Sequence, residues 1–179
     1  MPRLRSTFIV SVMLGAAFVL ILAAASRATH LQVHPLVPGI WISEQVQLDD
    51  IGKLKQQGFA AIIDLRPDGE QDGQSRSAEV EQAAAANGMT FAFVPVPHGD
   101  IPDSQVDSLA LSLDFAQKPV VLYCRSGRRA ARTWALSEAS RPGGLDANAI
   151  RRALDSARQS SPDLDLAIES RIAARNPVQ

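Results

Sequence analysis

Short apolar runs alternate along this chain with stretches in which apolar residues recur at helical spacing. The apolar runs have the length of buried strands and occupy residues 39–43, 59–65, 91–94 and 120–123. Apolar positions at helical spacing predict helices over residues 48–57, 77–87, 104–113, 130–136, 147–157 and 163–172. This alternation predicts an α/β fold with a parallel-rich central sheet and helices on both faces.

Two of the predicted helices begin at polar residues that are suited to capping. Ser104 is followed three positions later by Asp107, a spacing that resembles a capping box and places a helix start at Ser104. Asp146 precedes another apolar-periodic stretch and is expected to be its N-cap. Each of these positions would mark the end of the loop that precedes its helix.

The beginning of the chain has a different pattern, because residues 8–25 contain no charged residue and follow Arg3 and Arg5. Eighteen helical residues span about 27 Å, just enough for the hydrocarbon core of a bilayer. Residues 1–28 are therefore expected to be a signal peptide or a retained membrane anchor, with the anchor favoured, residues 29–37 a linker, and 38–179 the folded domain with C-terminal helices. The positive N-terminus would stay in the cytoplasm, placing the domain on the periplasmic or extracellular side.

The composition of the chain argues against several classes of function. The net charge of −1 gives no electrostatic case for binding nucleic acid. The single cysteine, Cys124, excludes an intrachain disulfide and a multi-cysteine metal site, and the three histidines have no metal-ligand spacing with it. We therefore expect neither a metal nor a cofactor.

The clearest chemical signal is the segment from Cys124 to Arg129, which joins an apolar strand to a predicted helix. A loop of this kind presents backbone N–H groups and a helix N-terminus to an anion, and it favours a cysteine thiolate. Gly127 allows the tight turn and Arg129 can hold two oxygens of a tetrahedral anion. Arg125, Ser126 and Arg128 complete the loop, although Arg128 is expected to face solvent.

The loop Cys-Arg-Ser-Gly-x-Arg, with residues 38–45, 58–70 and 134–136, resembles a bacterial family of tyrosine- and dual-specificity-phosphatase-like domains, small domains also found fused to β-lactamase-like hydrolases. The resemblance covers roughly residues 36–140 and implies a phosphatase-like hydrolase of the same fold class. It further implies that Cys124 attacks phosphorus and forms a thiophosphate intermediate. The implied substrate is a phosphorylated protein or a small phosphoester, and a Gram-negative host would place the domain in the periplasm.

The resemblance also places a general acid on the loop before the cysteine strand. Asp100 is the first candidate and Asp103 the second, because Asp103 could instead serve only as a helix-entry residue. His98 could bind substrate or titrate, but an exposed loop histidine is the simpler interpretation. Arg66 follows another strand, so it could line the anion pocket or pair with Glu70 as a structural brace.

Two other functions remain open from the sequence. Ordinary cysteine phosphatases have five residues between the cysteine and the arginine, whereas Cys124 and Arg129 are separated by four, as in rhodanese sulfurtransferases. A tighter ring suits the single sulfur of a persulfide, but other stretches typical of rhodaneses are missing. The third possibility is an inactive, membrane-tethered module that only binds anions.

Overall fold

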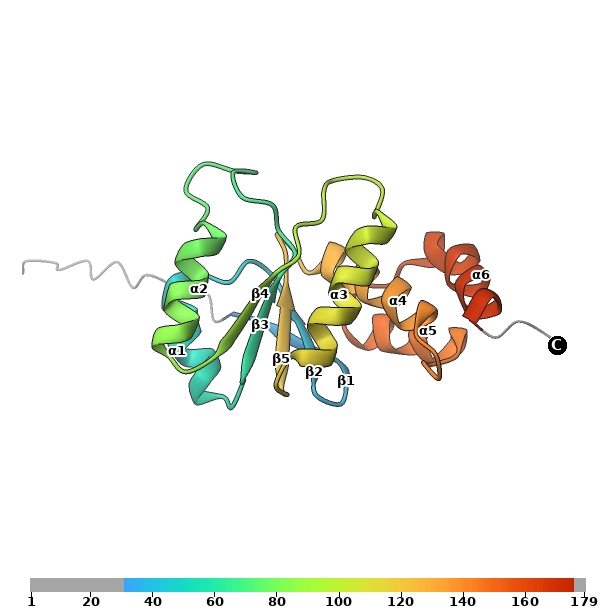
Figure 1. Cartoon of the computed structure of the whole chain (residues 1–179), viewed down its shortest axis with the longest axis horizontal. Helices are drawn as coiled ribbons and strands as arrows, with labels where there is room; N and C mark the ends of the chain where they lie inside the picture. The colour runs from blue at the N-terminus through green and yellow to red at the C-terminus, as the bar shows by residue number, and fades with distance from the viewer. Residues whose placement is uncertain (1–30, 176–179) are drawn as a thin grey trace, which may run out of the picture. The chain divides into compact units, whose positions relative to one another are not determined.

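The computed structural model describes residues 31–175 of the 179-residue chain, which form one unit around a five-stranded sheet (Figure 1). The strand order is β1-β2-β5-β3-β4. Strand β1 pairs with β2 antiparallel, and the pairs β2–β5, β5–β3 and β3–β4 are parallel. The strands are β1 (Val33–Val37), β2 (Ile40–Ser43), β3 (Ala61–Asp64), β4 (Thr90–Phe93) and β5 (Val120–Tyr123). The sheet is thus mixed but mostly parallel, which confirms the predicted α/β class.

Strand β1 corrects the predicted domain boundary. Residues 29–37 were expected to be a linker, but Val33 pairs with Ser43 and Pro35 with Trp41. Pro35 concealed the strand because proline is scarce in sheets, yet an edge strand tolerates it, since one side of the strand needs no ladder partner. The sheet therefore begins before residue 38.

Within residues 31–175, six α-helices connect or follow the strands. They are α1 (Leu48–Gln56), α2 (Ser77–Ala86), α3 (Asp103–Phe115), α4 (Arg128–Ser140), α5 (Ala147–Ser156) and α6 (Asp165–Arg175), with a 3₁₀ turn, η1 (Pro162–Leu164), before the last. Asp146 caps α5 as predicted, because its carboxylate accepts a hydrogen bond from the N–H of Ala149 at 2.8 Å. The predicted capping box at Ser104 is wrong. Helix α3 begins at Asp103, and its N-cap is Pro102, two residues before the predicted cap, with the extended backbone that is typical of an N-cap.

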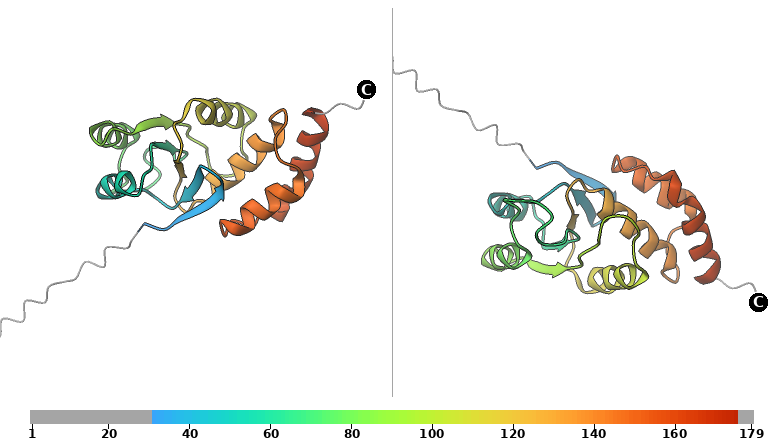
Figure 2. Two further views of the ribbon diagram at one scale, coloured as in Figure 1. Left: turned by 90° about the horizontal axis from the view of Figure 1, so that it is seen from below. Right: turned by 90° about the horizontal axis from the view of Figure 1, so that it is seen from above.

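Helices cover both faces of the sheet, as predicted (Figures 1 and 2). Alternate residues of the parallel strands enter two separate cores because successive side chains of a strand point to opposite faces. Val121 and Tyr123 of β5 pack in the core that includes residues of α1 and α2. Val120 and Leu122 pack in the core that includes residues of α3 to α6. Both halves of the molecule are thereby anchored to β5, the strand that ends at Cys124.

The expected N-terminal hydrophobic helix and the signal peptide or anchor of residues 1–28 lie outside the described residues. Within residues 31–175, the helices are too short or too polar to cross a membrane.

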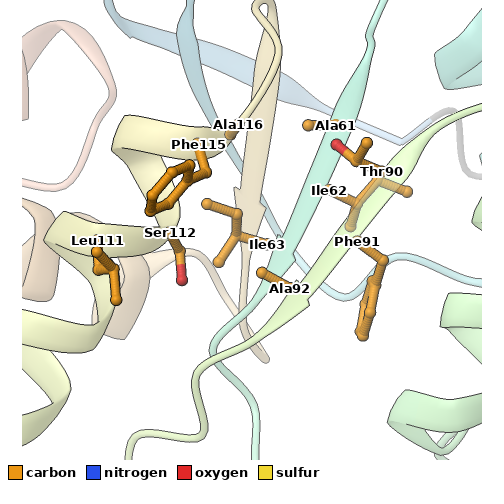
Figure 3. Close-up of a pocket in the computed structure, with 10 residues that line it drawn as sticks. All are labelled: Ala61, Ile62, Ile63, Thr90, Phe91, Ala92, Leu111, Ser112, Phe115 and Ala116. Carbon is orange, nitrogen blue, oxygen red and sulfur yellow. The ribbon is translucent and has the colours of Figure 1, made fainter.

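A hollow of about 410 Å³ lies where α3 leaves part of the sheet uncovered near the edge strand β4. Figure 3 shows Phe115 and Leu111 of α3 on one side and Ile63 and Ala92 of the strands on the other. We call it the apolar groove, and its ten lining residues include no charged side chain. The lining residues are Ala61, Ile62, Ile63, Thr90, Phe91, Ala92, Leu111, Ser112, Phe115 and Ala116.

Candidate active site

The site forms at the carboxyl ends of three neighbouring parallel strands. Asp64 at the end of β3 lies opposite Tyr123 of β5 and Phe93 of β4. The segments that leave these strands therefore start at the same edge of the sheet. They carry Arg66 and Glu70 after β3, Val96 and His98 after β4, and Cys124 after β5. Parallel strands with crossover helices bring such segments together at this edge in α/β proteins.

The loop after Cys124 is held from outside by hydrogen bonds to its carbonyl groups. The carbonyl of Arg125 accepts from the backbone N–H of Gln45 at 3.3 Å, and that of Ser126 accepts from the side-chain amide of Gln159 at 3.1 Å. A turn between a strand and a helix whose carbonyl oxygens are bonded to neighbouring segments is of the kind that can present backbone N–H groups to an anion. Cys124 lies beneath the loop and is only 1% exposed.

Gly127 makes this loop possible in two ways. Its φ of +81° lies in the left-handed region that side chains rarely adopt. A Cβ atom there would lie 2.8 Å from Cγ2 of Ile42 and 3.0 Å from Nε2 of Gln159. The loop therefore packs against β2 and the C-terminal part of the chain at the point where α4 starts.

Arg129 is fixed by a carboxylate rather than left free. Its two terminal nitrogens contact the two oxygens of Glu70 at 2.6 and 2.7 Å, and Nη1 also donates to the carbonyl of Val96 at 2.6 Å. Burial alone would lower the pKa of Arg129, but the hydrogen bonds to Glu70 and the charge of a Cys124 thiolate outweigh it and raise that pKa. The guanidinium is thus a permanent cation close to the cysteine sulfur.

Arg66 braces Glu70 from behind. Its Nε donates to Glu70 at 3.0 Å and its Nη1 donates to Gln45 at 2.6 Å, while the residue is 3% exposed. Arg66 is not among the residues that line the cavity described next, so its contacts are those of the brace. Burial raises the pKa of Glu70, but the hydrogen bonds from Arg129 and Arg66 lower it more, and the net shift is downward. Glu70 is therefore held as an anion and is unsuited to donate a proton.

A cavity of about 330 Å³, here called the arginine pocket, opens over the loop. Arg125, Ser126 and Arg128 were predicted to bind substrate, and all three line it. Arg128 nevertheless remains 62% exposed on its side chain, in line with its expected contact with solvent. The full lining comprises His98, Gly99, Arg125, Ser126, Arg128, Arg129 and Arg132.

The acid candidates lie in different surroundings. Asp100 is exposed on the loop beside the pocket, and its carboxylate makes no hydrogen bond or ion pair with the rest of residues 31–175. Asp103 is paired with Arg171 of α6. His98 lines the pocket, and its Nε2 lies 3.3 Å from Glu70.

One titratable group behind the site was missed from the sequence. Asp64 is 1% exposed, and its carboxylate accepts the backbone N–H of Arg66 at 2.7 Å. Burial raises the pKa of Asp64 from 3.8 to about 6, and hydrogen bonding only partly opposes this shift. The sequence did contain a signal, because Asp64 ends an apolar run that was predicted to be a buried strand. A carboxylate at such a position is unusual, since acidic residues are rarely fully buried.

Other contributors were also missed. Glu70 was expected to pair with Arg66, but its contact with Arg129 joins residues 59 positions apart. Gln159 supports the loop from 33 positions away, and no local pattern marks it. Arg132 lies one helical turn after Arg128, so the helical period placed it on the same face of α4.

The structure thus places a cysteine between a strand and a helix at the carboxyl edge of a mostly parallel α/β sheet, with an arginine beside its sulfur. The chain belongs to the family described as Beta-lactamase hydrolase-like protein, phosphatase-like domain, whose model matches residues 32–141. That match includes strand β1 and ends just after α4. The resemblance noted from the sequence is therefore confirmed.

Curated relatives share this part of the chain. A Beta-lactamase hydrolase-like protein of Agrobacterium fabrum is 36% identical over 98 residues, covering 55% of this chain and 23% of the relative. One from Xylella fastidiosa (strain Temecula1) is 33% identical over 97 residues, covering 54% of this chain and 22% of the relative. The chain therefore matches less than a quarter of the length of each relative.

The fold also matches solved structures. The structure of a candidate phosphatase from Neisseria meningitidis Z2491 is 27% identical, with a TM-score of 0.67, and the match covers 77% of this chain and 96% of that one. This α/β architecture is thus shared with a phosphatase-like protein that it matches over almost the whole of that protein's chain.

Proposed function

We propose that this protein is a cysteine-dependent phosphatase that hydrolyses phosphate monoesters. The observation that carries the proposal is the pairing of Cys124, under a loop whose carbonyls are held outward, with an arginine locked by Glu70. Membership of a phosphatase-like family supports it. The loop N–H groups and Arg129 would act together on one anion, and preorganised donors of this kind stabilise charge that develops in a transition state.

The reaction would proceed in two steps. The Cys124 thiolate attacks phosphorus, an S–P bond forms, and the P–O bond to the leaving group breaks as that oxygen takes a proton from an acid. Water then attacks the thiophosphate and gives a proton to the carboxylate left by the acid, the S–P bond breaks, and phosphate leaves as the thiolate returns. In both steps the loop N–H groups and Arg129 would bind the three non-bridging oxygens, and Ser126 would donate to the sulfur as it leaves.

We propose Asp100 as the general acid, because Asp103 is held by Arg171 whereas Asp100 is unpaired and exposed beside the pocket. Removing an acid slows ester cleavage by about 10²-fold or more, and the loss is greatest for poor leaving groups. Asp100→Asn should therefore reduce kcat on phenyl phosphate far more than on p-nitrophenyl phosphate. His98→Gln is the comparison, and the larger loss there would assign the acid to His98 instead.

A second function is favoured by the short spacing between Cys124 and Arg129. A four-residue ring suits a persulfide sulfur, so a sulfurtransferase that carries sulfur on Cys124 remains the competing proposal. Such an enzyme needs the N–H groups of the loop but no acid on the loop after β4. Asp100→Asn would then leave its rate unchanged.

The test compares the full chain with its Cys124→Ser variant in two assays run in parallel. Hydrolysis of p-nitrophenyl phosphate that disappears in the variant supports the phosphatase, with a loss on the order of 10³-fold or more, as for other nucleophile replacements. Transfer of sulfur from thiosulfate to cyanide, without phosphate release, would overturn it in favour of the sulfurtransferase. Inactivity in both assays, with phosphate still bound, would point to an anion-binding module.

A further inference from the structure

The arginine pocket holds more positive charge than one phosphate group needs. Of its four arginines, Arg129 is already neutralised by Glu70. The seven residues that line the pocket include no carboxylate and no Phe, Tyr or Trp. A ligand with several negative charges would be stabilised among these arginines.

Two of these arginines are arranged as a pair beside the loop. Arg128 and Arg132 lie one turn apart on α4, so both side chains leave the same face of the helix. Both reach the same carboxylate, since Nη1 of Arg132 lies 2.7 and 2.8 Å from the two oxygens of Asp163, and Nη2 of Arg128 lies 4.0 Å from one of them. The pair already binds an anionic group, and that group is supplied by the protein.

The carboxylate of Asp163 is accessible from solvent where it meets this pair. The residue comes from η1, a short 3₁₀ turn, and its side chain is 56% exposed. The hydrogen bond from Arg132 lowers the pKa of Asp163, so the carboxylate is an anion at neutral pH. A phosphate group carries more charge and more acceptor oxygens than a carboxylate, so it competes well for a pair of guanidinium groups.

We propose that the substrate is a small molecule with a second phosphate group next to the one that is cleaved, and that Arg128 and Arg132 bind this second group in place of Asp163. This inference rests on the proposed function, because it assumes that the first phosphate occupies the Cys124 loop. It names the class of substrate, a compact bisphosphate, and it assigns Arg132 a role in specificity.

The test measures binding separately from catalysis, so that the two proposals can fail independently. Full-length Cys124→Ser protein is titrated by calorimetry with 2,3-bisphosphoglycerate and with 3-phosphoglycerate, which differ only in the second phosphate. We expect the bisphosphate to bind about tenfold or more tightly, the gain typical of charge-assisted hydrogen bonds. Equal affinities would overturn the inference, whatever the wild-type enzyme does with p-nitrophenyl phosphate.

Three variants in the Cys124→Ser background sharpen the result. The quantity compared is the ratio of the affinity for the bisphosphate to the affinity for the monophosphate. Arg132→Gln should lower this ratio to about threefold or less. Asp163→Asn should raise it, because the competing carboxylate is removed. Arg152→Gln removes the same charge from an exposed position of α5 that does not line the pocket, and it should leave the ratio unchanged. A lower affinity ratio in Asp163→Asn would contradict a second phosphate site. An equal decrease of the ratio in Arg132→Gln and Arg152→Gln would contradict it as well.

Discussion

The arginine pocket and the apolar groove are two hollows of similar size on one domain, about 330 and 410 Å³, with opposite chemistry. The pocket lies at the carboxyl ends of the parallel strands, where each chain segment leaves the sheet and carries polar residues. The groove lies along the strands themselves, where alternate side chains are apolar because they face a helix layer. Position relative to the strand ends, rather than volume, separates the two.

The difference shows what a reactive site requires beyond a cavity. In the pocket, Glu70 holds Arg129 and Arg66 together, and the loop carbonyls are tied to Gln45 and Gln159. The groove has no charged lining residue, and its largest side chain from α3, Phe115, is 82% exposed. Substitutions should therefore have large, charge-dependent effects in the pocket and small effects in the groove.

Replacing Glu70 is expected to have the largest effect. Glu70→Gln leaves Arg66 buried beside a neutral partner and releases Arg129, so we expect a destabilisation of about 2 kcal/mol or more and a loss of about 10²-fold in kcat/KM. Since the pKa of Glu70 is lowered in the folded state, its stabilisation is present at neutral pH and is lost as the pH falls through that lowered pKa.

Denaturant melts of wild type and Glu70→Gln between pH 3 and pH 7 measure this acid-dependent stabilisation. The two free energies of unfolding should converge toward acid pH. A constant difference over the whole range would show that the contribution of Glu70 does not depend on its charge.

Gly127→Ala is expected to have the next largest effect. The added Cβ meets Ile42 at 2.8 Å and requires a positive φ, so the loop must shift. We expect a destabilisation of about 1–3 kcal/mol and a loss of activity of about tenfold to 10²-fold. Gly58→Ala is the matched control, because Gly58 also has a positive φ, an added Cβ there meets no atom within 4 Å, and the residue does not line the arginine pocket. Equal losses in both variants would mean that strain, not the contact with Ile42, is responsible.

Replacing Asp64 should change stability in the opposite direction, by a similar amount and only at high pH. Because the folded-state pKa of Asp64 is raised to about 6, its contribution to stability is largest below about pH 4 and is lost as the pH rises through 6. Asp64→Asn keeps an acceptor for the N–H of Arg66 and removes the buried charge, so it should stabilise the protein by about 1–3 kcal/mol at pH 8. Thermal melts at pH 5 and pH 8 test this, and an equal shift in Tm at both values would contradict it.

The groove should give the smallest effect. Phe115→Ser changes an exposed side chain, so we expect the free energy of unfolding to change by less than about 0.5 kcal/mol and kcat/KM to stay at the wild-type value. Val106→Ser, a buried change on the same helix, is the contrasting variant and should destabilise clearly. A large loss of activity in Phe115→Ser would show that the apolar groove also contributes to catalysis.

Much of the fold could be predicted because the strands that organise it are continuous apolar runs and the helices have clear periodicity. Strand β1 was not predicted, because His34 and Pro35 interrupt the apolar run of residues 33–37. The N-cap of α3 was predicted two residues late, because Ser104 is a more common capping residue than Pro102.

The site was only partly predictable for a different reason. Cys124 and Arg129 are recognisable because they are close in sequence and the loop motif is local. The contact of Glu70 with Arg129 and the support from Gln159 depend on how distant segments meet, which spacing does not encode. Burial of Asp64 likewise follows from packing on both faces of β3.

The most direct test of the account is the mass of the covalent intermediate on Cys124. Full-length protein is mixed with p-nitrophenyl phosphate or with thiosulfate, quenched, and analysed by intact-mass and peptide mass spectrometry. The phosphatase predicts a phosphoryl adduct of about 80 Da on the peptide with Cys124 after the first reagent, and none in Cys124→Ser. A sulfur adduct of about 32 Da after thiosulfate, with no phosphoryl adduct, would contradict the account and assign the loop to sulfur transfer.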